Sequence, residues 1–109
     1  MKYFIITLTF ISLFSCKKHE KKLEGSWFVN YFKNDLKTND FTLLLNEGGT
    51  GKIDGVTDVS WGVNKKDLTL IIDDYSQDWE NNRNKNNEQY YISSDSLGNY
   101  LRMEMERIK

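Results

Sequence analysis

Side chains that act as nucleophiles or general bases are scarce in this chain. Its 109 residues include one cysteine, Cys16, and one histidine, His19, which follows three positions later. Nucleophilic catalysis needs a thiol or hydroxyl that a rigid scaffold holds within hydrogen-bond reach of a base. Both residues lie instead in a charged segment that directly follows an apolar leader. The sequence therefore predicts no catalytic pair of this kind.

Acidic side chains gather in two places where carboxylate chemistry could be sought. Asp73, Asp74 and Asp78 offer oxygen ligands for calcium, but the spacing of an EF-hand loop is missing. Glu104 and Glu106 would share one face of a strand, as paired carboxylates of a glycosidase could, but they alternate with apolar residues. That alternation is typical of the solvated side of a sheet. We expect solvated carboxylates, no metal, no cofactor and no enzymatic activity.

The first residues have the pattern of an export signal. Lys2 supplies a positive charge, and residues 3–14 are apolar apart from two threonines and a serine. This run suits a signal peptide and is too short for the ~30 Å hydrocarbon core of a bilayer, which needs roughly 20 apolar residues. It ends at Leu13-Phe14-Ser15-Cys16, which resembles a bacterial lipobox. The alternatives are an ordinary secretory signal cleaved near Ser15 and an uncleaved anchor.

The lipobox resemblance implies a lipoprotein of the cell envelope. Signal peptidase II would remove residues 1–15, and Cys16 would become the first residue and carry palmitate-type acyl chains. Each buried CH₂ contributes ~0.8 kcal/mol, so several chains anchor a protein permanently. Residues 16–24 then form a polar tether, and residues 25–109 form the domain. We expect attachment to the outer membrane, facing the periplasm.

Composition limits the rest of the chain to one small domain. Removing residues 1–15 leaves 94 residues with 14 basic and 16 acidic side chains, because the leader contains only one charge. Nucleic-acid-binding domains show a basic excess or patch, which this balance does not provide. With one cysteine, no internal disulfide can form. We expect a membrane-attached domain with no nucleic-acid partner.

Apolar and polar residues alternate in short segments separated by turn-forming residues, which predicts β-strands. In the last segment Leu101, Met103 and Met105 alternate with charged residues, and residues 47–51 form a glycine-rich hairpin turn. The predicted strands are residues 25–32, 40–46, 52–54, 58–63, 68–73, 90–93 and 100–108. Neighbouring strands joined by tight turns pair antiparallel. We expect an all-β fold, a small antiparallel meander barrel or strongly coiled sheet of about seven to eight strands.

Several short motifs in these strands resemble those of lipocalin-like lipoproteins, which are abundant in Bacteroidetes. Gly25-Ser26-Trp27 resembles the G-x-W signature, and Val59-Ser60-Trp61 and Leu68-Thr69-Leu70 also fit, over residues 23–108. The resemblance implies that Trp27 plugs one end of a barrel. It also implies that an arginine of the last strand packs over this indole. This arginine could be Arg102 or Arg107, and we take Arg102 as the candidate.

The aromatic residues suggest what such a barrel could bind. Trp61, Tyr90, Tyr100 and Trp79 are the candidates for lining a ligand cavity, although core packing explains them as well. Residues 75–88 are predicted to be a polar loop that shapes one mouth, with Trp79 docked on the barrel or exposed to a partner. We expect non-enzymatic binding of a small apolar ligand or an envelope partner. The alternative is a protein-interaction module, an inhibitor or accessory subunit, with a filled core.

Overall fold

The protein is represented by a computed structural model that describes residues 19–108. A short helix at residues 19–23 precedes eight strands. The strands are β1 (Gly25–Lys33), β2 (Leu36–Leu45), β3 (Thr50–Ile53), β4 (Thr57–Asn64), β5 (Asp67–Ile72), β6 (Tyr75–Asn84), β7 (Glu88–Ser94) and β8 (Tyr100–Arg107). Cys16 and the predicted leader lie outside the described residues. Within residues 19–108, no helix has the length and apolar character needed to span a bilayer.

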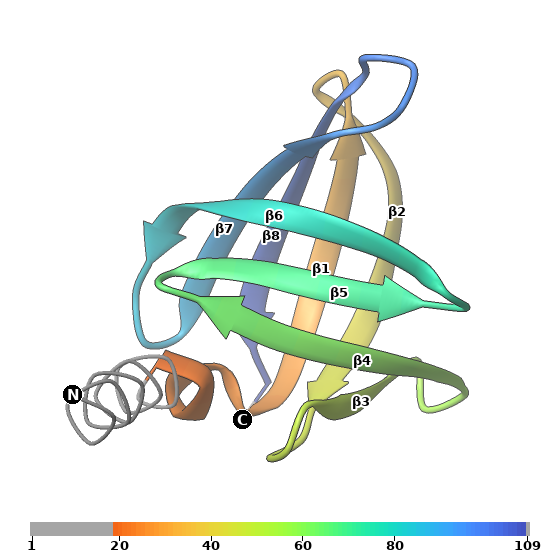
Figure 1. The fold of residues 1–109 in the computed structure, drawn as a ribbon. Helices are drawn as coiled ribbons and strands as arrows, with labels where there is room; N and C mark the ends of the chain where they lie inside the picture. Colours follow the sequence, from red (N-terminus) through yellow and green to blue (C-terminus); the bar gives the residue numbers. More distant parts are fainter. Residues whose placement is uncertain (1–18, 109) are drawn as a thin grey trace, which may run out of the picture.

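The eight strands close into one antiparallel barrel (Figure 1). Each strand pairs with the next along the chain, and β1 also pairs with β8, from Trp27 opposite Arg107 to Lys33 opposite Leu101. Closure leaves neither end of the meander as an open sheet edge, which would invite aggregation. The prediction of an all-β fold with a small antiparallel barrel is confirmed, with eight strands.

The two-residue alternation of the sequence fills the barrel interior. Side chains on a strand point alternately to its two faces, so every second residue faces inward. The inward face of β8 is fully apolar at its centre, where Met103 is 1% exposed and Met105 is 0% exposed. The buried apolar core consists of Leu23, Trp27, Val29, Leu43, Leu45, Val59, Trp61, Leu68, Leu70, Trp79, Tyr91, Leu101, Met103 and Met105. This core lies inside the cylinder of strands.

The prediction that residues 75–88 form a loop is wrong. Residues 75–84 are strand β6, which pairs with β5 and β7, and only residues 85–87 connect β6 to β7. Polar side chains hid this strand, because only Trp79 is buried among its ten residues. The first half of β6 pairs with β5 and the second half pairs with β7, so neighbouring strands supply backbone partners along β6 regardless of side-chain polarity. Tertiary context thus overrides the weak local preference.

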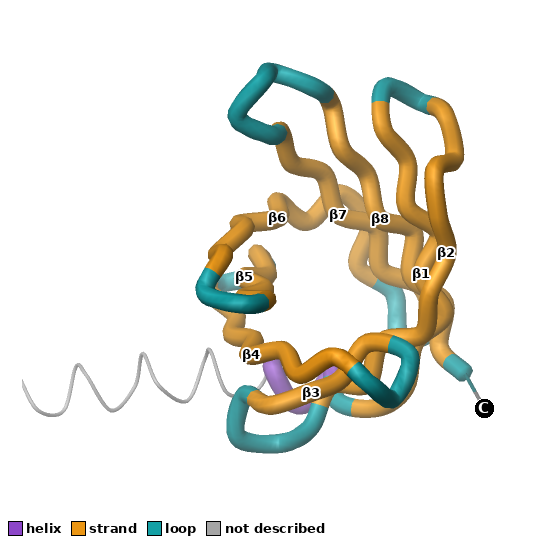
Figure 2. Tube along the Cα trace, turned by 90° about the vertical axis from the view of Figure 1, so that its right-hand side faces the viewer, coloured by secondary structure: helices purple, strands orange, loops and turns teal. Residues whose placement is uncertain are grey.

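Successive strands run in opposite directions, which divides the turns between the two ends of the barrel. The turns at residues 34–35, 54–56, 73–74 and 95–99 lie at one end, which we call the open end. The turns at residues 46–49, 65–66 and 85–87 lie at the other, which we call the closed end and which the short helix approaches (Figures 1 and 2). The barrel therefore has two chemically distinct ends.

Candidate ligand-binding site

The closed end is sealed by Trp27. This side chain is 0% exposed, and its Nε1 donates a 2.8 Å hydrogen bond to the carbonyl oxygen of Leu23 in the short helix. The guanidinium carbon of Arg107 lies 4.3 Å from the centre of the ring. A cation at this distance from an indole face is attracted by its quadrupole. The role of Trp27 as a plug, implied by the family resemblance, agrees with this geometry.

Of the two arginines considered for Trp27, Arg107 packs over the indole and the candidate Arg102 does not, and the strand register explains why. Trp27 is paired with Arg107 across β1 and β8, and both residues occupy the inward face. Arg102 is an even-numbered residue on the outward face of β8, where its guanidinium lies 4.2 Å from the ring of Phe32. It also bonds Asp35 and Glu104. The alternation that buries Met103 and Met105 thus selects Arg107.

A buried amide completes the interior of the closed end. Gln89 is 0% exposed, and its Nε2 donates to Asn84 Oδ1 at 2.7 Å and to the Lys85 carbonyl at 2.8 Å. Its Oε1 accepts from Asn81 Nδ2 and from the hydroxyl of Tyr91. Burial raises the pKa of Tyr91, so its hydroxyl stays protonated as a donor. Every polar atom of this amide is satisfied, which makes the cluster structural.

A cavity of about 320 Å³ opens into the interior from the open end. Its walls come from β1, β2, β3, β5, β6 and β8, with Asp54 of the turn after β3. The lining residues are Tyr31, Asn39, Phe41, Ile53, Asp54, Leu70, Ile72, Tyr75, Gln77, Trp79, Leu101 and Met103. Small-molecule sites occupy about 300–1,000 Å³ and are mostly apolar with a few polar groups. The cavity fits this description at its small end.

The deep part of the cavity is apolar and aromatic. Tyr31 and Trp79 meet edge to face, with ring centres 6.1 Å apart and planes at 76°. Trp79 is 4% exposed, whereas Tyr31 and Phe41 are only partly buried. Aromatic rings in this arrangement form a rigid wall that contributes contact area with little loss of side-chain entropy. Leu70 and Met103 line the same space with aliphatic surface.

Polar groups lie toward the mouth of the cavity. The hydroxyl of Tyr75 donates to Gln77 Oε1 at 3.1 Å, and Gln77 Nε2 donates to the Ser94 carbonyl at 3.0 Å and to Ser93 Oγ. Burial, followed by the nearby Asp95 and Tyr75, raises the pKa of Tyr31. Its phenol is therefore protonated at neutral pH and able to donate a hydrogen bond.

Of the four residues that were predicted to bind ligand, only Trp79 lines the interior cavity. Trp79 lines the cavity, as predicted, and is not an exposed anchor. Trp61 is buried at the closed end, where its Nε1 donates to the carbonyls of Asn46 and Thr50 at 3.0 and 2.9 Å. Its position is that of a core residue that fixes the glycine hairpin between β2 and β3.

Tyr90 and Tyr100 lie outside the barrel, so the prediction that they line its interior is wrong. Both are even-numbered residues on strands whose odd-numbered residues face inward. Tyr90 is covered by Arg83, whose guanidinium carbon lies 5.0 Å from the ring centre, and Tyr100 is 39% exposed. Tyr31 and Gln77 were missed as site residues. Alternation in β1 places Tyr31 on the inward face with Trp27, and it would have placed Gln77 had β6 been recognised.

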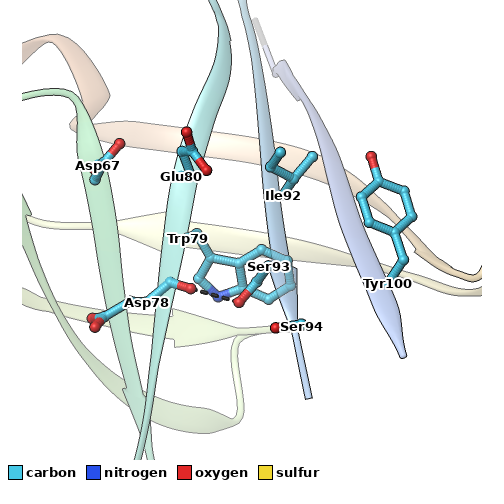
Figure 3. Close-up of a pocket in the computed structure, with 8 residues that line it drawn as sticks. All are labelled: Asp67, Asp78, Trp79, Glu80, Ile92, Ser93, Ser94 and Tyr100. Atoms are coloured by element: carbon cyan, nitrogen blue, oxygen red, sulfur yellow. Dashed lines mark hydrogen bonds between the residues drawn. The ribbon is translucent and has the colours of Figure 1, made fainter. Parts of the chain in front are cut away.

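A second hollow lies beside β6, β7 and β8, is lined in part by Tyr100 and shares Trp79 with the interior cavity (Figure 3). It measures about 430 Å³ but is open to solvent, and its walls include the carboxylates of Asp67, Asp78 and Glu80. Asp78 and Ser93 are joined there by a 2.6 Å hydrogen bond from the hydroxyl to the carbonyl. Because binding sites enclose most of a ligand, the smaller interior cavity is the better candidate.

Comparison with known proteins supports the fold and leaves the activity open. No family model and no curated protein matches this chain. Among solved structures, a redesigned β-barrel aligns with a TM-score of 0.61 at 12% sequence identity. The alignment covers 86% of this chain and 97% of that chain. At this identity the likeness shows the class alone, a small closed β-barrel.

Proposed function

We propose that this chain is a lipid-anchored lipoprotein of the cell envelope whose barrel binds a small apolar molecule without catalysis. The observation that carries the proposal is the cavity of about 320 Å³ at the open end, walled by aromatic and aliphatic side chains. The opposite end is sealed by Trp27 and Arg107, so the barrel is a cup with one mouth. This architecture, together with Gly25-Ser26-Trp27, supports a lipocalin-like mode of binding.

Uptake of a neutral fluorescent probe tests whether the cavity binds ligands. N-phenyl-1-naphthylamine should brighten with the folded mature chain, and its binding should saturate at one site. Ile72 lines the cavity and its neighbour Ile71 faces outward, 39% exposed. Ile72→Trp fills the space and should abolish the brightening, whereas Ile71→Trp adds the same side chain outside and should preserve it. Equal uptake by both variants would place the probe elsewhere.

The lipid anchor is supported by the lipobox resemblance of Leu13-Phe14-Ser15-Cys16. It is further supported by the short helix at the closed end, whose first described residue, His19, is three positions after Cys16, so that an anchor there leaves the mouth accessible. Bacteria that express the full chain should incorporate radiolabelled palmitate into it, and Cys16→Ala should lose the label. The labelled protein should fractionate with the outer membrane. Palmitate remaining on the Cys16→Ala variant would contradict the assignment.

A protein-interaction module remains a second candidate because apolar side chains protrude from the open end. Leu36 is 73% exposed, Val56 79%, and Leu97 84%, and each lies in or next to a different turn. Exposed apolar patches on soluble domains often mark partner sites. If the barrel is such a module, Val56→Ser/Leu97→Ser should abolish co-purification of one specific envelope protein. Leu44→Ser, on the outer face near the closed end, should not.

A further inference from the structure

An exposed carboxylate lies at the mouth of the cavity, and no basic residue is found among the described residues that line it. Among the described residues that line the cavity, Asp54 is the only charged one. Its Oδ1 accepts hydrogen bonds from the backbone nitrogen and hydroxyl of Thr42. Its charge therefore acts at the mouth, where a ligand with a carboxylate head would meet repulsion instead of a counter-charge. The site is poorly built for fatty acids.

Aromatic rings surround the same space. Tyr31, Phe41, Tyr75 and Trp79 are one third of the lining residues. The face of an aromatic ring attracts an ammonium or quaternary ammonium group within about 6 Å, and the attraction grows when the cation is desolvated. The methyl groups of such a cation also gain contact area with the rings. Rings and one carboxylate together form the kind of site that holds an organic cation.

Further negative charge lies around the mouth of the cavity. The four turns of the open end contain five aspartates and no lysine, arginine or histidine: Asp35, Asp54, Asp73, Asp74 and Asp95. Lys33 lies 3.9 Å from Asp95, and Arg102 lies 2.8 Å from Asp35, so the nearest cations offset only two of these charges. A cleft lined by one sign of charge concentrates ligands of the opposite sign and repels those of the same sign.

From these three observations we infer that the cavity selects small organic cations with an apolar body, such as alkylamines or quaternary ammonium compounds. The apolar body lies against Leu70, Trp79 and Met103, and the cationic head lies near the mouth, between Asp54 and the rings of Tyr31 and Tyr75. This inference rests on the proposed function of the cavity as a ligand site, and names the class of ligand.

Three probes with the same chain and different heads test the selection: octyltrimethylammonium, 1-octanol and octanoate. Each is titrated by calorimetry into the mature chain below its aggregation concentration, at low and at physiological salt. Octyltrimethylammonium should bind about 10-fold or more tightly than octanoate, with 1-octanol between them. The preference should shrink at higher salt, because the rim charges are exposed to screening.

A pair of charge-matched variants locates the effect. Asp54→Asn keeps the oxygen that accepts from Thr42 but removes the charge, and it should weaken octyltrimethylammonium binding about 3- to 10-fold while leaving 1-octanol within twofold. Asp58→Asn changes the net charge equally, but Asp58 pairs with Lys52 outside the lining of the cavity, 2.7 Å from its Nζ. This variant should bind all three probes as the unsubstituted chain does.

The outcomes separate the inference from the proposed function. If octanoate and 1-octanol bind as well as octyltrimethylammonium, the selection is wrong and the cavity is an unselective apolar site. Equal weakening by Asp54→Asn and Asp58→Asn would assign the preference to net charge and would also overturn the inference. If none of the three probes binds and N-phenyl-1-naphthylamine does not bind either, both the inference and the proposed function are wrong.

Discussion

At the scale of single residues, Arg107 connects three parts of the molecule at the closed end. Its guanidinium covers Trp27 and donates to the carbonyls of Lys22 and Glu24, at 2.7 and 2.8 Å. These carbonyls belong to the short helix and the residue after it, so one side chain joins the helix, β1 and β8. The packing of Trp27 therefore depends on Arg107, a residue of β8 that lies 80 positions later in the sequence.

Arg107→Met should destabilise the domain by about 2 kcal/mol, because it removes three charge-assisted hydrogen bonds, to the carbonyls of Lys22, Glu24 and Asn86, and the contact of a cation with an indole. For a domain of this size that corresponds to a fall in Tm of roughly 10 °C. Arg102→Met removes two partly exposed ion pairs and the contact with the ring of Phe32 on the outer face, and should cost only about 1 kcal/mol. Urea unfolding followed by tryptophan fluorescence measures both. A larger loss from Arg102→Met would reverse their assigned roles.

His19 makes the stability of the domain depend on pH. Its Nε2 is buried without a hydrogen-bond partner, and burial, followed by the charges of Lys22 and Lys66, lowers its pKa below the ordinary 6.5. The folded protein thus favours the neutral imidazole, and the unfolded chain takes up the proton first as pH falls. The stability associated with neutral His19 is complete above pH 6.5 and is lost as pH falls toward its lowered pKa.

Thermal unfolding between pH 7.5 and 5.5 measures this effect. The Tm should fall with pH, and the fall should be smaller in His19→Gln, which cannot take up a proton in this range. A control at pH 7.5 reports any general cost of the substitution. An identical decrease in both proteins would show that other groups cause it.

At the scale of elements, the hairpin from β2 to β3 depends on a glycine that no other residue can replace. A Cβ on Gly51 would overlap the carbonyl oxygen of Leu44 and lie 3.1 Å from a methyl of Val59. Gly62 on the neighbouring strand has no atom within 4 Å of the position a Cβ would take. There is therefore room for a Cβ at Gly62 but not at Gly51, although both glycines lie inside strands.

Gly51→Ala should destabilise the domain by about 2–3 kcal/mol, because backbone on one side and a core side chain on the other prevent relaxation. Gly62→Ala should be neutral or stabilise it by about 0.5 kcal/mol, because alanine loses less backbone entropy than glycine on folding. Chemical unfolding of the two variants compares them directly. Equal behaviour would mean that β3 can shift to accept the methyl group.

Strand alternation made most elements predictable from the sequence, and its absence explains what was missed. The pattern of β8, with apolar residues at every second position, identifies both the strand and its inward face. In β6 only Trp79 is buried, and no period is visible among its polar neighbours. That strand exists because β5 supplies backbone partners to its first half and β7 to its second half, which a local pattern cannot reveal.

The candidate site was less predictable than the fold, because it depends on register between distant strands. Trp79 was identified as a candidate from its type alone, whereas Tyr31 lies 48 positions earlier in β1 and meets it only after closure. The choice between Arg102 and Arg107 likewise follows from the pairing of β1 with β8. Residue types suggested a barrel with a plug, but the pairing register of the strands determines which side chains form the plug and line the cavity.

At the scale of the whole molecule, charge is distributed unevenly between the two ends. The open end has the five aspartates of its turns, whereas the closed end has the lysines of the short helix and of the turns at residues 65–66 and 85–87. If Cys16 is lipid-modified as proposed, it lies three positions before His19, the first described residue of the helix. An extended chain of this length spans roughly 10 Å at most. The closed end must then lie next to the lipid head groups.

This geometry predicts that the barrel stands with its closed end on the membrane and its mouth facing away. Lysines near an anionic surface contribute about 1 kcal/mol each, and aspartates at the opposite end are repelled from it. Both effects favour the same orientation, and both add to the restraint from the short tether. A ligand would then enter the cavity from the aqueous side and not directly from the bilayer.

Two single-cysteine labels test the orientation in the lipidated protein, where Cys16 is blocked by acyl chains. Lys66→Cys places a fluorophore at the closed end, and Asp74→Cys places one at the open end. In vesicles with 30% anionic lipid and spin-labelled head groups, the Lys66→Cys label should be quenched strongly and the Asp74→Cys label weakly. Inserting twelve Gly/Ser residues between Cys16 and His19 should reduce the difference, because the tether then no longer holds the closed end down. Stronger quenching of the Asp74→Cys label would mean that the mouth faces the bilayer and takes its ligand from the lipid.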